Sequence, residues 1–265
     1  SAEWRATVAV LKGIVMAAFG IDFGTTTSGV VQLLAGQAER YGEDGLPLPS
    51  IVVIDRATGN AFGGRKAWNS RFDLAEQGKY HVIPSIKSVL ASDRSWPTPK
   101  RNWTSVDVAA FLFDQLRQSV ETRGSRISEA TVAIPVGMSA VARRTLRAAA
   151  RRAGIEVKAF IPESTAAVFC CYGDHRDLHR AVVFDWGGGT LDVSVLEFRS
   201  TGVHEIGLGG TATAGNVIDD QIARHQLRRR NLALRPLPDH MGYSHRLFLQ
   251  SGQCLLRLPF REKSN

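Results

Sequence analysis

The chain has 265 residues, of which 44% are hydrophobic and 22% are charged. This composition is typical of a globular protein and excludes a disordered or collagen-like chain. Three cysteines are too few, and odd in number, for a disulfide scaffold, so we expect a reducing, cytoplasmic location. No run of about 18 uncharged apolar residues occurs, so we expect no membrane span.

The net charge of +8 is concentrated at the C-terminal end. From Arg224 onward there are nine basic and two acidic residues, and the rest of the chain carries a net charge of only +1. The last 42 residues also contain no Val or Ile, whereas the first 223 contain 36. We therefore expect a basic, atypical tail at 225–265, which is either a solvated helix end with an irregular extension or a non-native ending. A body with almost no net charge does not favour nucleic acid as a partner.

The N-terminal end also differs from the body. The sequence starts at Ser1, and Met16 stands just before the first strong pattern. We expect 1–15 to be an N-terminal extension, unless translation naturally begins at Met16.

The first elements in chain order form a predicted hairpin. The apolar runs Phe19–Phe23 and Gly29–Leu34 flank a hydroxyl-rich turn, Gly24–Ser28. Another short strand is predicted at Ile51–Ile54. From 57 to 101 the sequence shows no persistent period, and we expect irregular structure there.

Clear helix signals return at Thr104. This residue is the predicted N-cap of a helix that ends near Arg123, and Ser139 is the predicted N-cap of a helix that ends at Arg152, before Gly154. The other predicted elements are the strands Thr131–Ile134, Glu156–Ile161, Ala181–Asp185, Leu191–Phe198 and Val203–Gly207, and helices at Glu163–Tyr172 and from about Asn216. This order predicts an α/β fold whose pattern restarts near Ala181.

An internal repeat is the most informative feature of the sequence. Phe19–Thr26 and Val183–Thr190 each contain an apolar strand, an Asp near its end, a glycine-rich turn and a Thr. Glycines let backbone N–H groups approach an anion closely, and an adjoining Asp can hold hydrated Mg²⁺. Either turn alone could be an ordinary tight hairpin. Together, about 163 residues apart, they predict two hairpins that clamp a phosphate chain from opposite sides.

The two turns resemble the phosphate hairpins of the seventy-kilodalton heat-shock protein (DnaK-type chaperone) family, in the actin-like ATPase superfamily. Ile83–Leu90 resembles the family's segment with the catalytic lysine, here Lys87. Thr131–Pro135, followed by Arg143, resembles the proline and arginine pair that couples nucleotide state to the partner domain. Pro162–Ala167 resembles the connecting motif E-P-T-A-A, with Ser164 in place of proline.

The resemblance extends from Phe19 to Arg224 and implies a truncated nucleotide-binding domain. Its expected parts are a ribonuclease-H-like first lobe at 16–180, with an inserted subdomain at about 49–103, and a partial second lobe at 181–224. We expect neither the later helical subdomain nor the glycine-rich turn that holds the adenosine in this family, because we find no pattern for them after Arg224.

The resemblance also implies a function. It is ATP binding and Mg²⁺-dependent ATP hydrolysis, with unfolded client proteins and co-chaperones bound through missing or separate domains. The implied residues around Mg²⁺ are Asp22, Asp185 and Asp192. Those that hold the phosphates of ATP or ADP are Gly24, Thr25, Thr26, Gly187, Gly188, Gly189 and Thr190. The implied catalytic residues are Lys87 at the γ-phosphoryl group, Glu163, which orients metal-bound water, and Asp185.

Several observations leave alternatives open. Lys87 could be a solvated lysine on an amphipathic helix, and Glu163 could be a first-turn acid favoured by the helix dipole. Ala214 and Val217 replace a glycine and an acid of the family's G-G-x-D-x-D motif. The alternative function is therefore a non-catalytic or degenerate actin-like interaction module that has lost the adenosine pocket.

Overall fold

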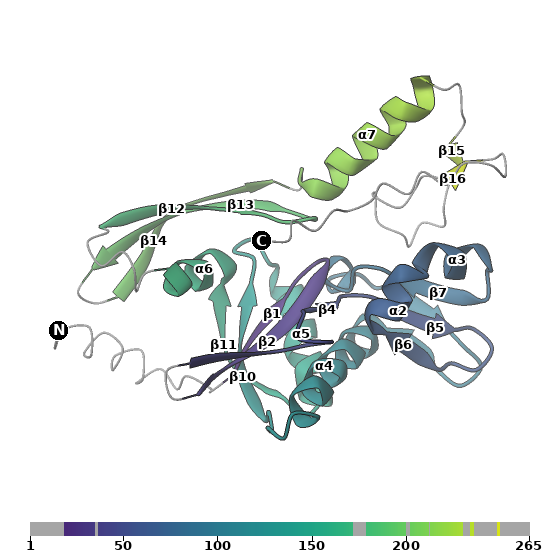
Figure 1. The fold of residues 1–265 in the computed structure, drawn as a ribbon, viewed down its shortest axis with the longest axis horizontal. Helices are drawn as coiled ribbons and strands as arrows, with labels where there is room; N and C mark the ends of the chain where they lie inside the picture. Colours follow the sequence, from purple (N-terminus) through teal and green to yellow (C-terminus); the bar gives the residue numbers. More distant parts are fainter. Residues whose placement is uncertain are drawn as a thin grey trace.

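A six-stranded sheet and a three-stranded sheet lie on either side of one short helix (Figure 1). The computed structural model describes residues 19–34, 37–171, 179–199, 202–211, 213–229, 234–235 and 248–249. The predicted extension at 1–15 and most of the predicted tail lie outside the described residues, as do Met16 and Tyr172.

The large sheet is mixed and has the order β11-β10-β1-β2-β3, with β4 beside β2. Its strands are β1 (Phe19–Phe23), β2 (Thr27–Leu34), β3 (Gln37–Tyr41), β4 (Leu48–Pro49), β10 (Glu129–Ile134) and β11 (Glu156–Pro162). The predicted hairpin is confirmed, because β1 pairs with β2 in antiparallel register and with β10 in parallel register. Along β1 the side chains of Phe19, Ile21 and Phe23 enter the core, so alternation turns Asp22 to the opposite face.

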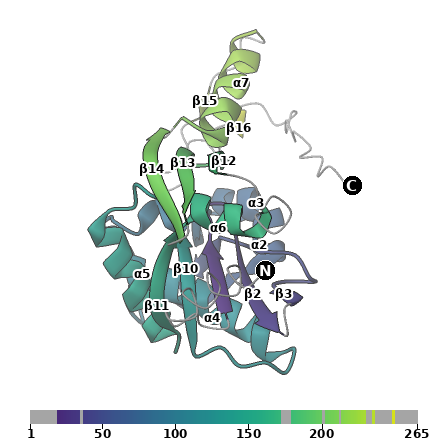
Figure 2. The same ribbon diagram turned by 90° about the vertical axis from the view of Figure 1, so that its left-hand side faces the viewer.

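Two helices, α4 (Ser105–Glu121) and α5 (Ala140–Arg152), cover one face of the large sheet (Figure 2). Their predicted ends are confirmed. Thr104 and Asp107 form a capping box on α4, and Ser139 Oγ accepts a hydrogen bond from the backbone N–H of Ala142 on α5. Gly154 follows α5 with φ +80°, the left-handed conformation that favours glycine after a helix. The apolar faces of these helices complete the main core.

The expectation of irregular structure at 57–101 is wrong. The segment contains β6 (Ala61–Gly63), α2 (Gly64–Asn69), α3 (Arg71–Glu76), β7 (Tyr80–Ile83), the 3₁₀ turn η1 (Lys87–Val89) and β8 (Ser95–Pro97). β6 and β7 flank β5 (Val52–Asp55), the strand predicted at Ile51–Ile54, and β8 pairs with β9 (Asn102–Thr104). Elements of three to six residues are too short to show a hydrophobic period. Buried Ile86 and Leu90 anchor η1 and fix the position of Lys87.

The small sheet has the order β12-β13-β14, with strands β12 (Arg180–Trp186), β13 (Leu191–Arg199) and β14 (Gly202–Thr211). All three predicted strands are confirmed, and their antiparallel meander repeats that of β1, β2 and β3. Helix α6 (Glu163–Cys171) contacts β10 and β11 on one side and β12 and β13 on the other.

After β14, the predicted last helix is α7 (Gly215–Arg229), and the two-residue strands β15 (Leu234–Arg235) and β16 (Phe248–Leu249) pair beyond it. None of the helices in the described parts of the chain is long and apolar enough to cross a membrane.

The packing of β1 on α4 yields a stability prediction. Phe113 is fully buried and stacks on Phe23, with ring centroids 4.9 Å apart, so Phe113→Ala should lower the free energy of unfolding by about 3–5 kcal/mol. The matched control is Phe184→Ala, because Phe184 is 70% exposed and its removal should change stability by less than about 0.5 kcal/mol. Denaturant unfolding followed by circular dichroism measures both, and equal losses would contradict this description of the core.

Candidate functional site

The two predicted turns face each other directly. A Cβ atom added to Gly188 would lie 2.9 Å from Oγ1 of Thr26, and one added to Gly189 would lie 3.1 Å from Oγ1 of Thr25. A side chain on either glycine would therefore crowd the threonine that faces it, so the glycines let the two turns approach closely. The structure thus brings the two halves of the sequence repeat together.

Two hydrogen bonds from Ser50 fix the first turn. Its hydroxyl donates to the carbonyl of Gly24 at 2.9 Å, and its backbone N–H donates to the carbonyl of Thr26 at 2.8 Å. Gly24 itself allows no side chain, because a Cβ there would lie 2.1 Å from the carbonyl oxygen of Thr27. Ser50 was not among the predicted site residues, and its position depends on pairing that a local sequence pattern does not show.

The second turn is closed by a hydrogen bond from the N–H of Gly187 to the carbonyl of Thr190, at 2.9 Å. The start of α7 packs against it. The N–H groups of Gly215 and Asn216 donate to the carbonyls of Gly187 and Gly188, at 3.1 and 2.8 Å. These two donors at the helix N-terminus are thus occupied by the turn itself.

Lys87 and Glu163 form an ion pair, with Nζ and Oε1 2.5 Å apart. Their side chains are only 12% and 16% exposed, so Lys87 is not a solvated lysine. Glu163 is the first residue of α6, as a first-turn acid would be, but its carboxylate contacts Lys87. The ion pair thus joins η1 to the helix that lies between the sheets.

Two carboxylates of the site have raised pKa values. Burial raises the pKa of Glu163 most, attraction to Lys87 opposes this, and the charges of Asp22 and Asp185 raise it further. Removal from bulk water also raises the pKa of Asp22 most, although water still reaches this residue; attraction to Lys87 opposes this, and the charge of Asp185 raises the pKa further. The four charged groups therefore lie close enough to act on one another, as predicted for a shared site.

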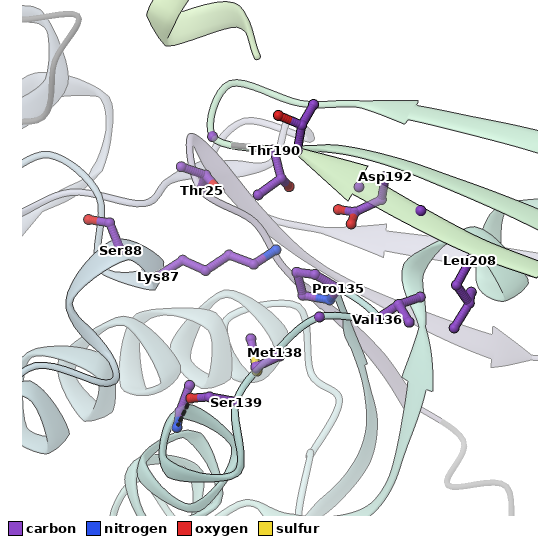
Figure 3. A pocket seen from close by; sticks show the side chains of 16 residues that line it. Thr25, Lys87, Ser88, Pro135, Val136, Met138, Ser139, Thr190, Asp192 and Leu208 are labelled. Atoms are coloured by element: carbon purple, nitrogen blue, oxygen red, sulfur yellow. Dashed lines mark hydrogen bonds between the residues drawn. The ribbon is translucent and has the colours of Figure 1, made fainter. Parts of the chain in front are cut away.

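A cavity of about 570 Å³ opens beside the ion pair and the turns (Figure 3). Lys87, Thr25, Thr190 and Asp192 border it on the side of the turns. Asp192 Oδ2 is buried and has no hydrogen-bond partner among the described residues, so a donor or a hydrated cation in the cavity could satisfy it.

Pro135–Ser139 and Leu208–Thr211 complete the lining of the cavity. Of these residues, the sequence had indicated Pro135 as part of a family motif and Ser139 only as the N-cap of a helix. A signal for β14 is the pair Gly209 and Gly210, because glycine inside a strand often marks the close approach of another group. Here that group is Asp192, whose Oδ1 would lie 2.8 Å from a Cβ on Gly210.

The predicted site residues thus form two connected groups. Those in the cavity wall are Thr25, Lys87, Gly189, Thr190 and Asp192. Those joined to it through the facing turns or through charge interactions are Asp22, Gly24, Thr26, Glu163, Asp185, Gly187 and Gly188.

Direct metal ligation is a separate question. Within the described ranges, no three His, Cys, Asp or Glu side chains lie close enough together to hold a metal ion directly. The carboxylates therefore fit a cation only if it keeps its water shell, which is the usual state of Mg²⁺ in proteins. Their role around Mg²⁺ stays a prediction.

A comparison with models of known protein families places part of this site within a family match. The family, described as Hsp70 protein, matches residues 75–231, which is more than half of the chain. The match includes Lys87, Glu163 and the whole second turn.

The raised pKa of Asp22 predicts how stability depends on pH. Ionising Asp22 costs free energy in the folded state. The contribution of Asp22 to the free energy of unfolding is therefore greatest below the usual carboxyl pKa, and it is lost as pH rises through the raised pKa. In the ligand-free protein, Asp22→Asn should therefore raise the melting temperature at pH 7, and the gain should shrink as pH falls toward 4. Calorimetric melting at several pH values measures this. The control is Asp93→Asn, on an exposed loop, and an equal gain there would mean that the effect is only one of net charge.

Proposed function

The chain belongs to the Hsp70 family, and on that premise we propose that it binds ATP between its two glycine-rich turns and hydrolyses it. The contact of Thr25 and Thr26 with Gly188 and Gly189 carries this proposal. It brings hydroxyl groups and glycine backbone from both turns to the wall of one cavity, which Thr25, Gly189 and Thr190 line, and this suits a chain of phosphates.

We further propose an actin-like architecture for this nucleotide-binding unit. The first lobe would be 16–180, with the subdomain at about 49–103, and the second would begin at 181. The repeated meander supports this proposal, because β1-β2-β3 and β12-β13-β14 have the same antiparallel order and carry equivalent turns.

The roles of the ion pair follow from the demands of phosphoryl transfer. Such reactions depend mostly on positioning and on charge stabilisation, because little covalent chemistry is left to the protein. Lys87 Nζ would neutralise charge that develops on the γ-phosphoryl oxygens, and Glu163 would hold Lys87 in place and orient a water molecule. The low exposure of both side chains strengthens these interactions.

The carboxylates on the two hairpins would hold the cation. Asp22, Asp185 and Asp192 would do so through water, and the unpartnered Oδ2 of Asp192 supports this assignment. Mg²⁺, when bound, would supply positive charge to the β- and γ-phosphates.

The proposed function also implies partners and a location in the cell. As an Hsp70-like chaperone, the protein would act in the cytoplasm on unfolded clients with co-chaperones. These would bind through other domains or surfaces. Pro135 lies in the cavity wall, where a partner domain could sense the nucleotide.

The start of α7 favours the second candidate function, a non-catalytic interaction module of the same fold. The N–H groups of Gly215 and Asn216 are occupied by the second turn, and Val217 stands where the family motif has an acid. This loop therefore offers fewer groups to a nucleotide than the family pattern implies. Such a module would bind phosphate or pyrophosphate without turnover and with little preference for adenine.

Titration calorimetry and a hydrolysis assay separate the two candidates. Wild-type protein should bind Mg-ATP and hydrolyse it, and Lys87→Ala should lower the hydrolysis rate by about 10²–10³-fold, the usual effect of losing one preorganised electrostatic group. Lys79→Ala is the matched control, because Lys79 is exposed and outside the site, and it should retain the wild-type rate. Absence of wild-type turnover, or an unchanged rate in Lys87→Ala, would contradict the enzymatic proposal.

A further inference from the structure

A buried chain of hydrogen bonds joins α6 to the small sheet next to the site. Ser194 Oγ donates to Ser164 Oγ at 2.8 Å, and Ser164 Oγ donates to Glu205 Oε1 at 3.3 Å. Ser164 is 2% exposed and Ser194 is fully buried. Each hydroxyl would be left without this partner if the other were removed, and a buried polar group without a partner is costly.

A β-bulge places Glu205 at the end of this chain. Ser194 pairs with Leu208, and Val195 pairs with Gly207, but the next residue, Leu196, pairs with Glu205. The register thus skips Ile206, which is 47% exposed. Without the bulge Leu196 would face Ile206, and alternation would turn Glu205 to the other side of the sheet.

Ser164 is also a distinctive residue of this chain, since it stands where the motif that the segment resembles has proline. It is the second residue of α6, where the backbone N–H needs no partner within the helix. A proline there would satisfy the helix equally well but would offer no hydroxyl. The hydroxyl therefore serves the contact with β13 and β14.

These hydrogen bonds connect the ion pair of Lys87 and Glu163 to Asp192. Ser164 directly follows Glu163, the partner of Lys87, and Ser194 lies two residues from Asp192 on the same face of β13. The bond between the two serines therefore fixes the distance from the ion pair to Asp192. The ion pair comes from η1 and α6, whereas Asp192 comes from β13, and these groups would have to act on one ligand.

We propose that Ser194, Ser164 and Glu205 form a positioning clamp that holds the Glu163 end of α6 against β13. The clamp touches no reacting atom, and its catalytic part rests on the proposed ATPase function. Its effect is on the placement of Glu163 and Lys87 relative to Asp192. Misplacement of catalytic groups by about 1 Å can lower a rate by about 10²-fold.

The test compares Ser164→Ala and Ser194→Ala with the wild type. The control is Ser119→Ala, a serine on α4 whose hydroxyl donates to the carbonyl of Leu116, away from the site. In both clamp variants we expect the turnover number for Mg-ATP to fall by about 10- to 100-fold, with the dissociation constant of Mg-ATP changed by less than about 3-fold. The double variant should lose no more than Ser164→Ala alone, because Ser164→Ala already removes the bond from Ser194 and the bond to Glu205.

A second measurement does not depend on activity. Carboxyl ¹³C NMR of the ligand-free proteins should show a lower pKa for Glu163 in both clamp variants. Burial is the largest cause of its raised pKa, and release of α6 would let water in. Ser119→Ala should leave this pKa unchanged.

If the variants of the buried serines do not fold, Glu205, which is only partly buried, provides the test. Glu205→Gln keeps an oxygen that accepts from Ser164 and should behave as wild type, whereas Glu205→Ala should lower the pKa of Glu163. An unchanged Glu163 pKa in every folded clamp variant, or equal changes in Glu205→Gln and Glu205→Ala, would overturn the proposal. If the wild type neither binds nor hydrolyses Mg-ATP, the ATPase function fails, and the Glu163 titration still decides the clamp.

Discussion

The ion pair between Lys87 and Glu163 determines the geometry of the site. It joins residues 76 positions apart in the sequence, one on a 3₁₀ turn and the other at the start of α6. Because α6 also contacts both sheets, fixing its first residue fixes the approach of the small sheet to the large one. The contact between the glycine-rich turns depends on this approach, since the hydroxyls of Thr25 and Thr26 lie so close to Gly188 and Gly189 that an added Cβ atom would crowd them.

Local sequence signals explain which elements could be predicted. Thr104, Ser139 and Gly154 act on helix ends within a few residues of themselves, so α4 and α5 could be assigned from the sequence with nearly correct bounds. The strands β6 and β7 could not, because they are three and four residues long and depend on pairing with β5. Their stability comes from non-local contacts, which leave no period in the sequence.

The same distinction applies to the site. The repeat at Asp22 and Asp185 could be recognised because each turn is a compact motif, and resemblance to a family located Lys87 and Glu163. Ser50, Ser194 and Glu205 could not be found in this way. Ser50 contributes through long-range pairing beneath the first turn, and Glu205 faces Ser164 only because of a one-residue shift in register between β13 and β14. A sequence pattern with a strict two-residue period assigns Glu205 to the wrong face.

The site holds like charges together at a cost in free energy. Asp22 raises the pKa of Glu163, and Asp185 raises the pKa of both, so the ligand-free cleft favours protonation of groups that a cation would need ionised. Among the causes that act on both carboxylates, only the positive charge of Lys87 lowers their pKa values. A bound cation would add a second opposing charge, and its binding would be coupled to loss of protons and to a gain in stability. Separation of the hairpins would relieve the repulsion without any ligand. Contacts that resist separation, such as the Lys87–Glu163 ion pair and the hydrogen bond from Ser194 to Ser164, therefore preserve the charge density that the proposed binding of a cation and its phosphate partner requires.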